Sequence, residues 1–195
     1  MRVPPFIAVL IMLVTSGSAF SQEDLTRGLQ LGLHGGMTSW AVGDIAGNEF
    51  DTETGFNVGG SVGWGMSDWL GIFARGDRTS INPKDLESYH VLHFDIGIRA
   101  ISQFIGPTIR PYFEVQGSVR DMSLIESNGF EISASGIGFG AGLGLFFFIS
   151  QKLALNAGVT AAFGNFDEVT FAGITIPDDV SATSGRLIAG VTLFP

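Results

Sequence analysis

The sequence predicts an all-β chain folded as an eight-stranded antiparallel up-and-down transmembrane β-barrel. Apolar residues recur at every second position through most of the chain, which is the period of a β-strand. The mean hydropathy is positive, at +0.35. After residue 20, however, no apolar run approaches the roughly 20 residues that a membrane helix needs. A closed barrel is the other structure that satisfies its backbone hydrogen bonds inside a membrane.

Composition excludes several classes of protein. The 195 residues fit one domain, and a hydrophobic content of 45% excludes a disordered chain. The absence of cysteine excludes a disulfide scaffold, a Cys-based metal site and a lipid-modified N-terminal Cys. The net charge of −9 argues against nucleic acid as a partner, because nucleic acid is bound by basic patches. We expect no metal and no cofactor.

Residues 1–21 read as a secretory signal peptide. Arg2 supplies a positive start, and Phe6–Val14 is an apolar core too short to span a bilayer. Small residues follow, and they predict cleavage after Ala19 or Ser21. The alternative is an N-terminal anchor helix, which the small-residue end disfavours. The chain is therefore expected to leave the cytoplasm, with residues 22–195 forming the barrel domain.

The first four predicted strands each separate apolar from small or polar residues. In Leu29–His34, three leucines alternate with Gln, Gly and His. In Phe56–Met66, large apolar residues alternate with Asn, Ser and Gly. Leu70–Asp77 alternates Leu, Ile and Ala with a face that carries Arg and Asp, and Leu92–Ala100 alternates Leu, Phe and Ile with His, Asp and Arg. This two-residue period predicts strands with two distinct faces.

The last four predicted strands repeat the pattern. Tyr112–Arg120 places Phe and Val opposite Glu, Gln and Arg, and Gly136–Phe147 alternates large apolar residues with glycines. Leu153–Phe163 and Arg186–Leu193 carry Leu, Val and Ala on one face. Most of the eight segments are near the roughly 9–11 residues with which a tilted strand crosses a bilayer.

The connectors between these strands alternate between long and short, which is typical of outer-membrane barrels. One end is expected to carry the long loops Ala41–Glu53, Thr79–Ser88, Asp121–Ser133 and Asn165–Ser184. The other end is expected to carry the tight turns Ser67–Asp68 and Ser150–Gln151 and the medium turn Ser102–Arg110.

Alternation alone does not say which face meets lipid, because a lipocalin-type carrier has the same period with its apolar residues inside. The polar face of Gly136–Phe147 carries five glycines, which suit a cramped interior better than a wet surface. The other face is Leu, Val, Ile, Phe and Ala without charge, as lipid requires. We therefore expect apolar side chains outside, with glycine and charge inside.

Aromatic residues gather near the strand ends, where outer-membrane barrels carry two interfacial girdles. The alternative is the ordinary aromatic content of a β protein. The predicted girdle comprises Trp40, Trp64, Trp69, Phe147 and Phe163, with Phe56, Tyr89, Phe104 and Phe148 nearby.

With its signal peptide, eight strands and glycine-rich sixth strand, the chain resembles the small OmpA/OmpX-like outer-membrane β-barrels. The C-terminal Gly190–Phe194 (GVTLF) and the segment Gly106–Tyr112 (GPTIRPY) also resemble that outer membrane protein β-barrel domain group. The resemblance implies a bacterial outer-membrane protein, inserted by the barrel assembly machinery through a C-terminal strand that ends in an aromatic residue. Here Pro195 follows Phe194. We expect no periplasmic peptidoglycan-binding domain.

The inward face collects charged residues from four of the strands. Side chains just fill the interior of an eight-stranded barrel, so charges there are buried. A buried charge without an oppositely charged partner costs roughly several kcal/mol. We expect an Arg–carboxylate network with Arg99 and Asp95 at its centre. The predicted lumen residues are Arg75, Asp77, His93, Asp95, Arg99, Glu114, Gln116, Arg120 and Arg186.

Three functions are compatible with this network. It either plugs and stiffens a barrel with a structural or surface-interaction role, or gates a narrow channel for ions or small solutes through exchanging pairs. A lipid-modifying enzyme is the third, and it needs a Ser–His pair oriented by a further polar group. His93 shares a face with Asp95, and Ser118 on the next strand is the candidate serine, although no serine is clearly paired with His93. No known deacylase motif is present, so we expect no enzymatic activity.

The long loops hold most of the acidic residues, and a solvated loop surface is their simplest interpretation. The apolar stretch Val169–Ile176 (VTFAGITI) is unusual for a loop. It predicts a hairpin that extends two strands beyond the membrane and can pair with a partner strand. The expected partners are outer-membrane lipids and an extracellular partner bound through the loops, and the chain is expected to be a monomer.

Overall fold

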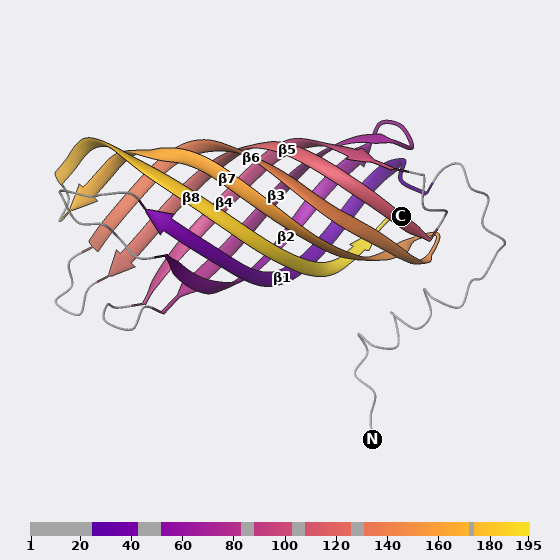
Figure 1. Ribbon diagram of the computed structural model, residues 1–195, viewed down its shortest axis with the longest axis horizontal. Coiled ribbons are helices and arrows are strands. Elements are labelled where there is room, and N and C mark those ends of the chain that lie inside the picture. The colour runs from indigo at the N-terminus through magenta and orange to yellow at the C-terminus, as the bar shows by residue number, and fades with distance from the viewer. Residues whose placement is uncertain (1–24, 43–51, 83–87, 103–107, 126–130, 172–173) are drawn as a thin grey trace, which may run out of the picture.

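The computed structural model describes residues 25–42, 52–82, 88–102, 108–125, 131–171 and 174–195. They form a closed barrel in which every strand pairs antiparallel with its chain neighbours and β8 closes on β1 (Figure 1). The predicted fold class is therefore confirmed. The strands are β1 (Gly28–Val42), β2 (Glu53–Gly65), β3 (Leu70–Ile81), β4 (Tyr89–Ile101), β5 (Ile109–Ile125), β6 (Glu131–Ser150), β7 (Leu153–Phe171) and β8 (Ile174–Leu193).

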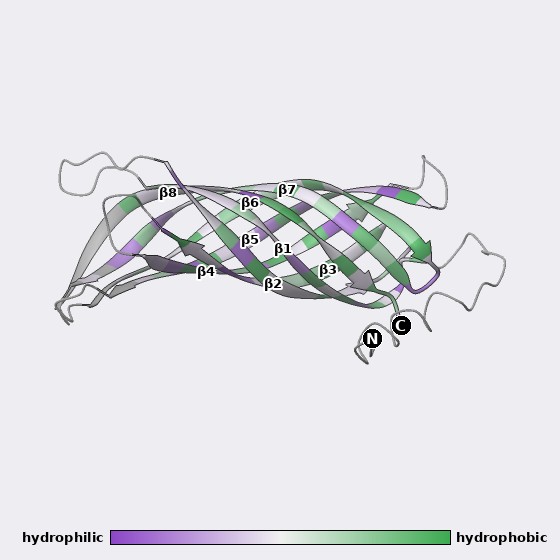
Figure 2. Ribbon diagram, turned by 90° about the horizontal axis from the view of Figure 1, so that it is seen from below, coloured by the Kyte–Doolittle hydropathy of each residue, from purple (hydrophilic) through white to green (hydrophobic). Residues whose placement is uncertain are grey.

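The apolar face of the strands is the outer one. Leu31, Phe94 and Leu143 are 43%, 49% and 59% exposed, whereas Gln30 and Asp95, one position away on the same strands, are buried. Figure 2 shows hydrophobic and hydrophilic residues alternating along the ribbons. Successive side chains of a strand point to opposite faces, so one parity covers the whole outer surface. This excludes the soluble carrier and confirms the predicted orientation.

The glycine face of β6 is needed because large side chains occupy the interior opposite it. A Cβ at Gly144 would collide with the Tyr112 ring, and a Cβ at Gly142 would collide with Thr160 and Glu114. Outward-facing Gly117, by contrast, has open space around its missing Cβ. The inward glycines therefore make room for their neighbours in a narrow barrel, as the sequence predicts.

The strands at one end run further than their apolar pattern predicts. β5 continues to Ile125, and β6 begins at Glu131. β7 continues to Phe171, and β8 begins at Ile174, with Val169 in register with Ile176. Most of the predicted loops Asp121–Ser133 and Asn165–Ser184 are therefore strand, and the hairpin predicted at Val169–Ile176 does extend β7 and β8. Backbone pairing needs only a neighbouring strand and continues in water after the apolar alternation has ended, which is why these loop boundaries are wrong.

The two ends of the barrel differ, and we name them by their connectors. The loop end carries the connections β1–β2, β3–β4, β5–β6 and β7–β8. The turn end carries the other three and the C-terminus (Figure 1). At the turn end, the Met66 and Ser67 amides donate to the Leu70 carbonyl, at 2.9 and 3.0 Å, and Arg27 pairs with Asp68 at 2.7 Å. None of the described segments is a helix with the length and apolar character needed to span a bilayer.

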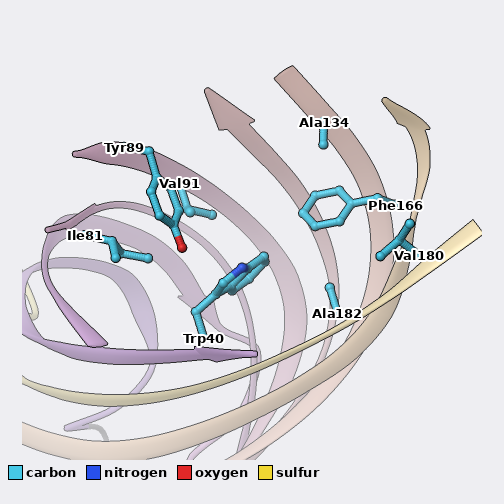
Figure 3. Close-up of a cluster of buried hydrophobic side chains, with 8 residues drawn as sticks. All are labelled: Trp40, Ile81, Tyr89, Val91, Ala134, Phe166, Val180 and Ala182. Carbon is cyan, nitrogen blue, oxygen red and sulfur yellow. The ribbon is translucent and has the colours of Figure 1, made fainter. Parts of the chain in front are cut away.

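Two apolar clusters fill the interior near the two ends. The loop-end cluster surrounds the Trp40 ring, which lies between side chains of β3 and β4 and side chains of β7 and β8 (Figure 3). It comprises Trp40, Ile81, Tyr89, Val91, Ala134, Phe166, Val180 and Ala182. The turn-end cluster comprises Leu25, Ile101, Tyr112, Phe146, Phe148, Ala154 and Phe194. The sequence pattern did not reveal these clusters, because their members interrupt a face that is otherwise glycine and polar.

Candidate functional site

A belt of ion pairs occupies the middle of the lumen between the two apolar clusters. Arg75 on β3 is its hub. The Arg75 guanidinium donates from Nη1 to Glu114 Oε1 at 2.8 Å, and from Nη2 to Asp95 Oδ2 at 3.2 Å and Gln116 Oε1 at 2.6 Å. Arg75 Nε also lies 3.8 Å from Asp77 Oδ2. One arginine therefore contacts all three carboxylates predicted for the lumen.

Arg186 ties the far side of the barrel to this belt. Its Nη1 donates to Asp77 Oδ2 and its Nη2 to Asp95 Oδ2, each at 2.6 Å. Arg186 comes from β8, whereas the two carboxylates come from β3 and β4. The pair of bonds crosses the lumen rather than running along one wall, and all three side chains are buried. We call the ion-paired residues the charged belt: Arg75, Asp77, Asp95, Arg99, Glu114 and Arg186.

Arg99 lies at the turn-end edge of the charged belt and not at its centre. It pairs with Glu114, its register neighbour, at 3.0 Å. Its guanidinium carbon lies 4.7 Å from the Phe73 and Tyr112 ring centroids and 5.3 Å from that of Phe146. The prediction that Arg99 is central is wrong. The alternation of side chains along a strand predicts which of them point into the lumen. It does not predict which residues of neighbouring strands lie at the same level, and the strand register places Arg75 opposite Asp95.

His34 is a lumen residue that the predicted network omits. Its Nε2 contacts Asp77 Oδ1, so Asp77 has partners on both carboxylate oxygens. The available signal was parity, because His34 follows Gln30 on the face opposite the three leucines of β1. A further polar chain on the loop side links Asn57 Nδ2 to Thr38 Oγ1 at 2.8 Å.

Arg120 and His93 share the lumen with the charged belt but form none of its ion pairs. Arg120 Nη1 donates to the Ala182 carbonyl at 2.8 Å, and its guanidinium carbon lies 5.4 Å from the Trp40 ring centroid. His93 meets the same indole edge-on at 5.4 Å. Neither His93 ring nitrogen nor the Ser118 hydroxyl has a hydrogen-bond partner in the part of the chain that the structure describes. The described part of the chain contains no cluster of His, Asp and Glu suited to hold a metal ion.

A closed eight-stranded barrel, apolar outside and charged within, is the form of a small outer-membrane protein, and the family comparison agrees with it. Residues 6–184 match the family model described as outer membrane protein beta-barrel domain. The chain belongs to this family. It is a bacterial outer-membrane barrel of the small eight-stranded class. A comparison with curated proteins finds no match.

Solved structures of other outer-membrane barrels share the fold of this barrel. Neisserial surface protein A has a TM-score of 0.63 at 16% identity, covering 85% of this chain and 96% of that one. OprG from Pseudomonas aeruginosa has a TM-score of 0.55 at 11% identity, with coverage of 86% and 96%. AlkL, solved in lipid bilayers, has a TM-score of 0.55 at 9% identity, with coverage of 92% and 96%. Identities this low show the fold alone.

Four of the five predicted girdle residues lie on the outer surface of this outer-membrane barrel. Their side chains are exposed, as a girdle requires: Trp64, Trp69, Phe147 and Phe163.

The fifth girdle prediction, Trp40, is wrong. Its side chain is 1% exposed and lies in the loop-end cluster. Trp40 is six positions after His34 and therefore on the same, inward face of β1. Tyr89 and Phe148 are also buried inside the barrel, because each lies on the inward parity of its strand, and Phe104 lies outside the described residues.

Proposed function

We propose that this barrel has a structural and surface-interaction role and that its lumen is plugged. The observation that carries the proposal is the filling of the lumen at three levels: the loop-end cluster, the charged belt and the turn-end cluster. A buried charge is stable only when paired and hydrogen-bonded, and the belt pairs its charges across the barrel. The same pairs stiffen the cylinder by joining β3, β4, β5 and β8.

The extended strands at the loop end support a role at the cell surface. β1 pairs with β8 only as far as Val42 opposite Ala182, so the β8 segment 174–181 is paired on its β7 side and has no β1 partner among the described residues. Such an edge offers backbone donors and acceptors to a partner strand. Pro177 lacks an N–H, and Asp178 and Asp179 add charge, both of which limit uncontrolled pairing. A partner is expected to use the short stretch before Pro177.

The remaining parts of the proposal concern the setting of the barrel. The segment 1–21 is proposed to be the signal peptide; it lies outside the described residues. The exposed apolar surface is proposed to contact outer-membrane lipids. Phe194, near the end of the chain, packs inside against Phe146 and Phe148, with ring centroids 5.7 and 5.1 Å away. The barrel assembly machinery is proposed to insert the chain, which then functions as a monomer.

Recording from planar lipid bilayers tests the plugged lumen. The purified protein, folded in detergent and inserted into the bilayer, is expected to give no discrete conductance steps. The fraction of barrel that is inserted is checked on the same preparation by its resistance to an added protease. Inserted protein that conducts in discrete steps would overturn the proposal.

A narrow gated channel is the second candidate, and one observation favours it. Asp95 Oδ2 accepts from both Arg75 and Arg186, so either arginine can release it while the other still holds it. Conductance steps that change on Arg186→Met would support this candidate, because Arg186 is one of the two arginines that contact Asp95. An enzyme has less support, since His93 and Ser118 form no hydrogen bond in the described structure. Analysis of lipid A from overproducing cells tests for an enzyme, and unchanged lipid A is expected.

A further inference from the structure

Arg120 is a buried cation that the charged belt does not neutralise. Arg75, Arg99 and Arg186 each contact at least one carboxylate, whereas Arg120 contacts none within the described part of the chain. Its side chain is 1% exposed. Nη1 donates to a backbone carbonyl, and Nε and Nη2 have no partner among the described residues. Between the two apolar clusters, the described residues thus include the four arginines Arg75, Arg99, Arg120 and Arg186, and of these only Arg120 forms no ion pair.

Several polar groups around Arg120 have no hydrogen-bond partner among the described residues. The Trp40 ring lies against the Arg120 guanidinium, and Trp40 Nε1 has no acceptor. His93 is in register with Arg120 across β4 and β5, touches the same indole, and has no partner on either ring nitrogen. Ser184 is in register with Trp40, and its hydroxyl is also without a partner. Unpartnered polar groups from β1, β4, β5 and β8 therefore lie around the contact between Arg120 and Trp40.

The chemistry of these donors selects an anion. The arginine guanidinium and the tryptophan N–H can only donate hydrogen bonds, and a buried donor without an acceptor costs stability. Water accepts from two of them but leaves the guanidinium charge uncompensated, and an uncompensated buried charge costs about several kcal/mol. An anion accepts from several donors at once and removes the excess charge. The loop-end cluster covers this position on its loop side, so the anion has to be small.

Asp95 limits how far toward the turn end the anion can lie. Its Oδ1 is an acceptor without a partner, and an anion against it would be repelled. Ser118 is in register with Asp95, and its free hydroxyl is a donor. A water placed between Ser118 and Asp95 Oδ1 would satisfy both groups. The anion therefore lies on the loop side of this row, at the level of Arg120 and Trp40.

We propose that the lumen binds a small monovalent anion of halide size between Arg120, Trp40, His93 and Ser184. The site lies between the charged belt and the loop-end cluster. Bound there, the anion supplies the ion-pair partner that Arg120 lacks among the described residues. Nothing in this proposal depends on whether the barrel conducts or binds a surface partner.

Anomalous diffraction from crystals of the detergent-folded protein grown in sodium bromide tests the site directly. The expected result is a bromide peak within hydrogen-bond distance of Arg120 Nε or Nη2. Crystals of Arg120→Gln are expected to lose this peak, and crystals of Arg27→Gln, which alters an exposed arginine at the turn end, are expected to keep it. An ordered water without anomalous signal at Arg120 in the wild-type protein overturns the proposal.

Thermal unfolding supplies a readout that needs no variant. At constant ionic strength, replacing a large organic anion by chloride is expected to raise the unfolding midpoint of the wild-type barrel by about 2–4 °C, because a ligand that binds only the folded state stabilises it. Arg120→Gln, if folded, is expected to lose this chloride-specific rise. Equal midpoints in both anions would count against the site even if Arg120→Gln fails to fold.

Discussion

Arg186 Nη1 lies 2.6 Å from Asp77 Oδ2, although the two residues are 109 positions apart in the chain. This bond joins β8 to β3 through the interior of the barrel, while their backbones are separated on the wall by β1 and β2. Ladder hydrogen bonds hold only neighbouring strands together. The charged belt adds direct connections between strands that are not neighbours, and those connections resist flattening of the cylinder.

Removing Arg186 is expected to destabilise the barrel strongly. Arg186→Met leaves Asp77 and Asp95 buried with less compensation, and breaking a buried pair in this way costs about 3–5 kcal/mol. The free energy of unfolding is measured by denaturant titration in lipid vesicles, with tryptophan fluorescence as the probe. Arg27→Gln is the matched control, because it removes an arginine from an exposed pair with Asp68 and is expected to cost about 0–1 kcal/mol. Equal losses in the two variants would show that the belt adds no stability.

Glycine placement is expected to decide whether the barrel folds. Gly144→Leu forces a side chain into the Tyr112 ring inside the lumen, whereas Gly117→Leu adds one to open space on the outer surface. Overpacking of an interior costs about 1–3 kcal/mol or more. Gel migration of unheated against boiled samples measures the folded fraction, since a folded barrel migrates differently before boiling. We expect Gly144→Leu to lose folded protein and Gly117→Leu to keep the wild-type fraction; the reverse order would contradict the inward assignment of the β6 glycines.

Two of the three tryptophans, Trp40 and Trp64, are expected to respond differently to lipid. Trp64 is exposed on the outer surface, and Trp40 is enclosed in the loop-end cluster. Each is studied in a variant that keeps this one tryptophan and replaces the other two by Phe. Lipids with brominated acyl chains quench fluorescence on contact. Trp64 is therefore expected to be quenched strongly in such vesicles, and Trp40 is expected to be quenched weakly. Strong quenching of Trp40 in a folded barrel would return it to the lipid-facing girdle.

How far the sequence predicts this molecule depends on the kind of information that each feature needs. Period-two alternation is a local property, so the strand number, the outward position of Leu143 and the inward position of Asp95 follow from it. The inward position of Trp40 was equally available from parity with His34. It was missed because aromatic residues near strand ends were assigned to a girdle by position alone.

Register is not local, and it limits what the sequence shows of the site. Parity places Arg75, Arg99 and Asp95 on one face, but only the pairing of β3 with β4 makes Arg75 the neighbour of Asp95. The reach of Arg186 across the lumen also depends on barrel closure. The alternation pattern assigns strand ends such as Ile125 to a loop, because it reports contact with lipid and backbone pairing continues beyond that contact.

The direction of the barrel in the membrane can be tested by cysteine labelling, because the chain has no native cysteine. Asp167 is exposed on β7 at the loop end, and Lys152 is exposed in the β6–β7 turn at the turn end. Long hairpins of outer-membrane barrels face outward, and short turns face the periplasm. A membrane-impermeant maleimide added to intact cells is therefore expected to label Asp167→Cys and to leave Lys152→Cys unlabelled until the outer membrane is permeabilised. If Lys152→Cys reacts in intact cells while Asp167→Cys does not, the loop end faces the periplasm and the proposed surface role of the β7–β8 hairpin is lost.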